Sequence, residues 1–175
     1  LAQACQRTGW PRRIFLFLLV ASIVAACAVL SHRQTRVWKN GISLWTGAIN
    51  NYPNLPLAYN NRGNAYCYLN ENRRALIDFD RALSIKPDYA DAYNNRGNAW
   101  RGLTEYGRAI ADYSSALRFN PDLTDTYFNR AVAYFLTKDY AAAVADLKKY
   151  ESLGGKVPPA FYRDLRPAMP DRTLN

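Results

Sequence analysis

Few side chains in this sequence of 175 residues can serve as metal ligands or catalytic nucleophiles. There is one histidine, His32, and there are three scattered cysteines, Cys5, Cys27 and Cys67. Three cysteines are too few for a disulfide framework, and a single histidine leaves no credible zinc spacing. No nucleophile stands beside a base, and no phosphate-binding loop is present. We therefore expect no enzymatic activity in this chain, no cofactor and no metal.

Acidic residues are missing from the first third of the chain. Residues 1–54 contain six lysines or arginines and no acid, whereas residues 55–156 carry 14 basic and 12 acidic groups. The net charge of +9 would ordinarily raise the question of nucleic-acid binding. Because most of the excess lies outside the nearly balanced segment, the distribution argues against nucleic acid as a partner.

The longest apolar run covers residues 14–30, which are 17 residues without a charge. At about 1.5 Å per residue this gives roughly 25 Å of helix, enough to span a bilayer with its flanks. We therefore expect a transmembrane helix over residues 14–31, preceded by an N-terminal flank of residues 1–13, with membrane lipid as a partner. The arginines that border the run are Arg12, Arg13, Arg33 and Arg36.

Other interpretations of this run remain open. A basic region, an apolar region and small residues around Cys27 follow one another as in a secretory or lipoprotein signal. A buried core helix is a further alternative. The chain begins with Leu1, as expected of a fragment or a processed product. Equal numbers of basic residues on the two sides of the run leave its orientation open.

Proline recurs at an interval of 34 residues, at Pro53, Pro87 and Pro121. The next position at this interval is Gly155, a residue that also ends helices. The chain therefore divides into three equal units without an insertion. These units are residues 56–89, 90–123 and 124–157.

Each unit has the pattern of two amphipathic helices separated by a polar break. In the first unit, Tyr59, Gly63 and Tyr66 lie on one face of the first helix, and Ala75 and Phe79 lie on one face of the second. The small residues let two backbones approach closely, and the aromatic rings fill the space beside them. The pattern predicts an all-α protein.

The same positions resemble the consensus of the tetratricopeptide repeat (TPR), which has aromatic or small residues at each of them. The resemblance covers residues 56–157 and implies an α-solenoid of three full repeats, with a concave groove lined by the first helices. Residues 36–54 resemble a degenerate half-repeat. Residues 158–175 are expected to form a capping helix and a tail, with Phe161 and Leu165 covering the last repeat.

Positions are counted from the first residue of each unit. Each repeat has an arginine at position 7, where the TPR consensus prefers leucine, and an aspartate 16 residues later. A charge in a half-buried helix seam needs a partner, so we predict an Arg–Asp pair inside each repeat. A row of arginines that grips an anionic ligand is the alternative. The predicted pairs are Arg62–Asp78, Arg96–Asp112 and Arg130–Asp146.

Asparagines recur at positions 5, 6 and 9 of the first helices. An amide has the donor and acceptor of a peptide group, so a ladder of amides can hold an extended chain by its backbone. The position-6 ladder is similar to that of O-GlcNAc transferase, which implies main-chain binding; the alternative is that these amides bond the neighbouring repeat and solvate a helix face. The candidate groove residues are Asn60, Asn61, Asn64, Asn94, Asn95, Asn98, Asn129 and Arg101.

Chaperone-adaptor TPR domains clamp a C-terminal carboxylate with cations, which this sequence lacks at the corresponding positions. Those positions hold Asn60, Asp125 and Asn129, so a carboxylate clamp of that kind is not expected. Two acidic groove candidates, Asp91 and Asp125, also disfavour nucleic acid.

The expected function is that of a membrane-anchored TPR scaffold that binds an extended segment of a protein partner in its groove. An alternative comes from TRVWKNGISLW, residues 35–45, which resembles the junction between the last membrane helix and the TPR tail of bacterial membrane glycosyltransferase-like proteins. That resemblance implies a non-catalytic C-terminal tail of a polytopic enzyme, with the repeats on the periplasmic side.

Overall fold

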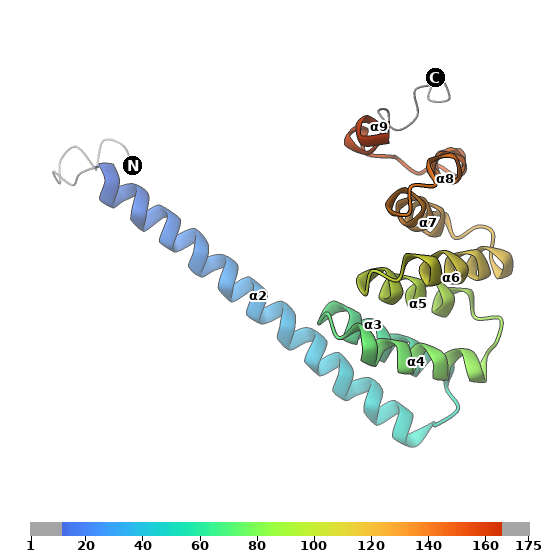
Figure 1. Ribbon diagram of the computed structural model, residues 1–175. Coiled ribbons are helices and arrows are strands. Elements are labelled where there is room, and N and C mark those ends of the chain that lie inside the picture. Colours follow the sequence, from blue (N-terminus) through green and yellow to red (C-terminus); the bar gives the residue numbers. More distant parts are fainter. Residues whose placement is uncertain (1–11, 166–175) are drawn as a thin grey trace. The chain divides into compact units, whose positions relative to one another are not determined.

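The computed structural model describes residues 12–165, which form eight α-helices and no strand (Figure 1). The predicted all-α class is confirmed for these residues. The chain separates into two units, Leu1–Asn40 and Gly41–Asn175. Most of the predicted N-terminal flank, residues 1–13, and the predicted tail after the capping helix lie outside the described residues.

Helix α2, Arg12–Asn51, continues without a break from the predicted membrane segment into the predicted half-repeat. Many of its large apolar side chains are exposed, among them Leu16, Phe17 and Leu30. Within residues 12–165, however, no helix combines the length and the apolar character needed to cross a membrane. The predicted transmembrane helix over residues 14–31 is therefore not supported, and neither is lipid as its partner.

Six helices of the second unit form three consecutive pairs, and each helix packs on the next. Helix α5 also contacts α3 and α7, so the first helices of the pairs lie side by side (Figure 1). We call the surface of α3, α5 and α7 the first-helix face. The pairs are α3 (Pro56–Tyr68) with α4 (Asn72–Ile85), α5 (Ala90–Gly102) with α6 (Tyr106–Phe119), and α7 (Thr124–Leu136) with α8 (Tyr140–Ser152).

The turn inside each pair places a residue other than glycine in the left-handed conformation. The φ angle is 59° at Asn70, 63° at Thr104 and 66° at Lys138. The next N–H then reaches back five residues, as Glu105 N does to Trp100 O at 3.0 Å, which closes the end of the first helix. Thr104 carries the most strain of the three, because a β-branched side chain crowds the backbone in this conformation.

Proline sets the boundary between consecutive pairs. The residues that follow α4 and α6, Lys86 and Asn120, have extended backbones with φ of −129° and −142°. The ring of a following proline favours this conformation over the helical one. Pro87 and Pro121 therefore end the second helices and turn the chain into the next pair.

Glycines let two helices of a pair come together around an aromatic ring. A Cβ atom at Gly63 would lie 2.7 Å from Cε1 of Phe79, and one at Gly97 would lie 2.7 Å from Cε1 of Tyr113. Both rings are fully buried. Any side chain at these glycines would have to displace a ring that close packing holds in place.

The third pair closes the array with an apolar cluster. Ala131 and Leu147 replace the glycine and the aromatic residue, and both are buried together with Leu165 of α9 (Pro159–Leu165). Phe161 of α9 lies against Phe135, with 5.3 Å between the ring centroids. The predicted contacts of Phe161 and Leu165 with the last repeat are confirmed.

The last turns of α2 pack against α3. A Cβ atom at Gly41 would be 3.9 Å from Cβ of Ala65, and Ile49 packs against the cluster that contains Tyr59. The half-repeat over residues 36–54 stays a prediction.

Candidate functional site

The predicted Arg–Asp pairs are confirmed in all three repeats. In each pair Nε and Nη2 of the arginine donate to the two carboxylate oxygens of the aspartate, at 2.7 to 2.8 Å. The aspartates are buried, and each joins the second helix to the first helix of its repeat. Paired, charge-assisted hydrogen bonds of this kind fix both distance and orientation.

The third nitrogen of each arginine reaches the helix that precedes its own helix in the chain. Nη1 of Arg62 donates to Oγ1 of Thr46 at 3.2 Å, and Nη1 of Arg96 donates to Oδ1 of Asp80 at 2.7 Å. Nη1 of Arg130 donates to Oγ of Ser114 at 3.0 Å. Each guanidinium also lies 5.4 to 5.9 Å from the ring centroid of the tyrosine three residues earlier. The arginines therefore tie neighbouring repeats together, and these contacts favour a structural role over the capture of an anionic ligand.

Pairing keeps these guanidinium groups charged. The hydrogen bonds that Arg96 donates to Asp112 raise the pKa of Arg96, although burial acts in the opposite direction. The pKa values of Arg62 and Arg130 are raised for the same reason by Asp78 and Asp146.

Five of the predicted asparagines form one hydrogen-bonded network across the first-helix face. One member, Asn60, is only 4% exposed. In each bond an Nδ2 group donates to the Oδ1 of the next residue, in the order Asn129 to Asn94 (3.4 Å), Asn94 to Asn95 (3.3 Å), Asn95 to Asn60 (3.0 Å) and Asn60 to Asn61 (3.3 Å). The network links α7, α5 and α3, so part of the predicted ladder connects the repeats to one another.

The network leaves unpaired groups at its two ends. Among residues 12–165, neither Nδ2 of Asn61 nor Oδ1 of Asn129 has a hydrogen-bond partner, and the amide of Asn64 has none. All three side chains are half-buried. The first-helix face therefore combines satisfied amides between the repeats with amide groups that have no partner among these residues.

The remaining two predicted site residues lie together in the second repeat. The hydroxyl of Tyr113 donates to Oδ1 of Asn98 at 2.8 Å, and Arg101 interacts with the same hydroxyl. Burial raises the pKa of Tyr113 to about 12, which the charge and hydrogen bonding of Arg101 oppose. The phenol is therefore neutral at neutral pH and can donate.

Two residues of the site were not predicted, namely Tyr113 and Thr126. The hydroxyl of Thr126, which is 2% exposed, donates to Oδ1 of Asn94 at 3.1 Å. The repeat pattern carried a signal for both. Thr126 stands where the other repeats have Ala58 and Ala92, and Tyr113 adds a hydroxyl to the position of a core aromatic residue.

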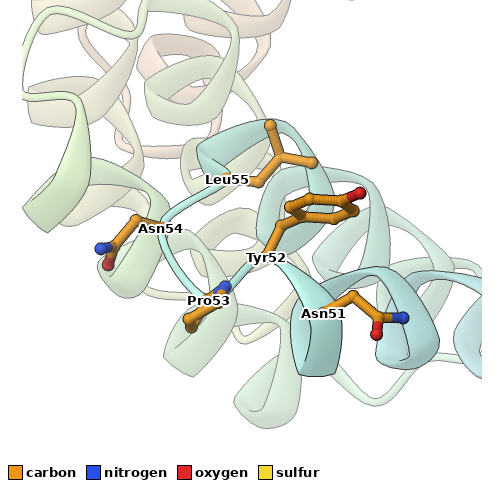
Figure 2. A pocket seen from close by; sticks show the side chains of 5 residues that line it. All are labelled: Asn51, Tyr52, Pro53, Asn54 and Leu55. Atoms are coloured by element: carbon orange, nitrogen blue, oxygen red, sulfur yellow. The ribbon is translucent and has the colours of Figure 1, made fainter.

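Two surface hollows lie at turns. One, of about 570 Å³, lies in the turn between α2 and α3, and another, of about 390 Å³, lies beside the turn of the first repeat. The first is lined by the residues labelled in Figure 2, which are Asn51, Tyr52, Pro53, Asn54 and Leu55. None of the predicted groove residues lines either hollow. Over the described part of the chain, no group of three or more histidines, cysteines, aspartates or glutamates is placed to hold a metal ion.

Solved structures share this fold. A crystal structure of MamA is 24% identical, with a TM-score of 0.61 over 65% of this chain and 66% of that one. A second MamA structure is 22% identical, with a TM-score of 0.62 over 69% and 70%. The first TPR of Spaghetti (RPAP3), bound to the HSP90 peptide SRMEEVD, is 21% identical, with a TM-score of 0.59 over 65% and 89%. At these identities the likeness concerns the fold.

Family models match the repeats themselves. A TPR repeat model matches residues 63–100 and 104–138, and a tetratricopeptide repeat model matches residues 124–153. No curated protein matches the sequence. The repeat matches, the helix pairs and the 34-residue period agree with one another, and the chain belongs to the tetratricopeptide repeat family.

Proposed function

We propose that this chain is a protein-interaction scaffold and that its first-helix face binds an extended peptide segment of a partner. The observation that carries the proposal is a set of amide groups on half-buried side chains that have no partner among residues 12–165: Nδ2 of Asn61, Oδ1 of Asn129 and the whole amide of Asn64. An unpaired amide in a half-buried position gains more from a ligand than a fully hydrated one does.

The chemistry of these amides fits a peptide backbone. Asn61 offers a donor at one end of the network and Asn129 an acceptor at the other. A main chain presents a carbonyl and an N–H at every residue, so an extended segment can meet both. The peptide complex of the RPAP3 TPR, a structure of similar fold, supports the same general function.

The hydrogen bonds already present favour this face as a rigid platform. Asn60, Asn94 and Asn95 hold their neighbours in place, and the Arg–Asp pairs fix the helices beneath them. A peptide that binds to fixed groups loses less of its binding energy to ordering the protein. Three repeats offer room for a short segment, so we expect modest affinity.

The test is a screen of the full chain against a library of random dodecapeptides, followed by anisotropy measurements on the best labelled binder. Asn61→Ala, Asn64→Ala and Asn129→Ala should each weaken binding by roughly 2- to 10-fold, the cost of one neutral hydrogen bond. Asn54→Ala is the matched control, because Asn54 is exposed in the turn between α2 and α3. Equal binding by the Asn61/Asn64/Asn129 triple alanine variant would contradict the proposal.

A further inference from the structure

The second repeat contains a cation without a carboxylate partner on the first-helix face. Arg101, in the last turn of α5, is half-buried, and within residues 12–165 no aspartate or glutamate pairs with it. The three arginines of the Arg–Asp pairs are, by contrast, all engaged. A half-buried guanidinium that lacks an anionic partner can donate hydrogen bonds to an anion of a ligand.

Neighbouring groups fix the chemistry around Arg101. Asn98 lies one helical turn earlier, so the two side chains share a face of α5. Because Oδ1 of Asn98 accepts the hydroxyl hydrogen of Tyr113, Nδ2 of Asn98 is left with its hydrogens unpaired among the described residues. The fully buried ring of Tyr113 holds this orientation in place. The group therefore presents a guanidinium, whose partner here is the hydroxyl of Tyr113, and an amide donor, with no carboxylate in the described part of the chain to satisfy them.

This combination occurs in the second repeat and in neither of the others. The first repeat keeps the asparagine but has neither the cation nor the hydroxyl, and the third repeat is apolar at all three positions. The equivalent residues are Asn64, Cys67 and Phe79 in the first repeat and Val132, Phe135 and Leu147 in the third. A feature needed for folding alone would be expected in every repeat, as the Arg–Asp pairs are.

The distribution of charge along the first-helix face favours binding of an acidic ligand group near Arg101. Asp91 and Asp125, in the first turns of α5 and α7, are exposed carboxylates at the opposite end of the helices from Arg101. They would repel an acidic group there and leave the Arg101 end as the favourable place for it.

We propose that Arg101 and Asn98 bind the carboxylate of an aspartate or glutamate side chain in the bound peptide, with Tyr113 as the positioning residue. The proposal rests on the proposed function, because it names the chemistry of the segment that the first-helix face selects. The carboxylate oxygens accept from the guanidinium and from the amide of Asn98, and no covalent step is involved. Partial burial makes such charge-assisted bonds stronger than bonds on an open surface.

The experiment uses the full chain and the random dodecapeptide library. Binders are expected to share an acidic residue, and its change to the matching amide (Asp to Asn, Glu to Gln) should weaken binding to the unaltered protein by about tenfold. With Arg101→Gln the same change in the peptide should alter affinity by less than about twofold. Arg108→Gln is the matched control, because Arg108 lies over the ring of Trp100 and should leave the tenfold effect intact.

Tyr113→Phe tests the positioning role. Phenylalanine is the residue that the first repeat has at the equivalent position, Phe79, so the ring packing is retained. The variant should lose several-fold of the preference for acid over amide while its melting profile stays close to that of the parent. An unchanged preference in Tyr113→Phe would remove Tyr113 from the proposal.

The outcomes separate this proposal from the proposed function. If the binders have no acidic residue, the carboxylate site is overturned and peptide binding is left intact. The same follows if changing the peptide's acid to its amide lowers the affinity of the parent and of Arg101→Gln equally. A library that yields no binder at all would overturn the proposed function and the site together.

Discussion

The second and third repeats solve the same packing problem in two ways. The second repeat places Gly97 against the ring of Tyr113, whereas the third places Ala131 against the smaller Leu147. In both cases the sum of the two side chains fills the space between the helices. The two repeats therefore keep the combined volume of the two positions, and a change at one position is accommodated only when the other changes with it.

The two repeats also differ where they meet a neighbour. Asn94 of the second repeat bonds Asn129 and Thr126 of the third, but the third repeat has Phe128 at the position of Asn94. Phe128 packs instead on Tyr150 and Phe161. A buried amide needs a partner, and the last repeat faces the capping helix, which offers apolar side chains. The asparagine network therefore stops where the stack of repeats stops.

We expect the largest loss of stability when a substitution removes one partner of an Arg–Asp pair. Asp146→Ala leaves Arg130 half-buried with the hydroxyl of Ser114 as its remaining hydrogen-bond partner, and should cost about 3 kcal/mol of unfolding free energy. Asp112→Ala should cost about 1 kcal/mol less, because Arg96 keeps Asp80 at 2.7 Å. Urea unfolding measures both losses.

Two results would count against this account of the pairs. Equal losses for Asp112→Ala and Asp146→Ala would show that Asp80 does not compensate. Additive effects of Arg96→Ala and Asp112→Ala in the double variant would show that the pair itself contributes no coupling.

The next largest effect is expected at the glycine that faces the buried ring in the second repeat. Gly97→Ala forces a Cβ atom to within 2.7 Å of the buried ring of Tyr113 and should cost about 2 kcal/mol. Gly97→Ala with Tyr113→Leu recreates the Ala131 and Leu147 pair of the third repeat. The double variant should be more stable than the sum of the single losses by at least about 1 kcal/mol in chemical unfolding. Strict additivity would mean that the two positions do not share one volume.

Tyr113 makes the stability of the second repeat depend on alkaline pH. Burial raises the pKa of this phenol from 10 to about 12, so the folded protein holds the proton more tightly than the unfolded chain. The resulting stability is complete below pH 10 and is lost as the pH rises towards 12, by about 1 kcal/mol at pH 11. Tyr113→Phe should remove this part of the alkaline loss in melts at pH 9 and pH 11. The same slope in both proteins would contradict the assignment.

The smallest effect concerns the left-handed turns. Asparagine tolerates this conformation better than threonine, so Thr104→Asn should give the second repeat the turn that the first has at Asn70. We expect a gain of about 0.5 kcal/mol, seen as a higher melting temperature. Asn70→Thr is the reverse control and should lower stability by a similar amount.

The helical pairs and their internal charges could be predicted from the sequence, because they depend on local spacing. A 34-residue period fixes which residues face one another, and an offset of 16 residues was enough to pair Arg62 with Asp78. The contacts of Phe161 and Leu165 followed from the apolar end of the last repeat.

The site could be predicted only in part, because the sequence does not show how neighbouring repeats divide their hydrogen bonds. Asn60 and Asn94 were grouped with Asn64 as groove residues, but the first two bond across repeats and Asn64 does not. The role of Tyr113 depends on the hydroxyl reaching Asn98, which a consensus of aromatic positions does not encode. For the apolar run, counting uncharged residues did not lead to a membrane span in the described helices.

The most direct test of the first-helix face as a peptide-binding surface is a nuclear magnetic resonance titration of the full chain with the best dodecapeptide. The side-chain amide signals of Asn61 and Asn64 should shift as the peptide saturates the protein, while the signal of the exposed Asn54 should not. Shifts confined to residues of α4, α6 and α8, with Asn61 and Asn64 unmoved, would contradict the account.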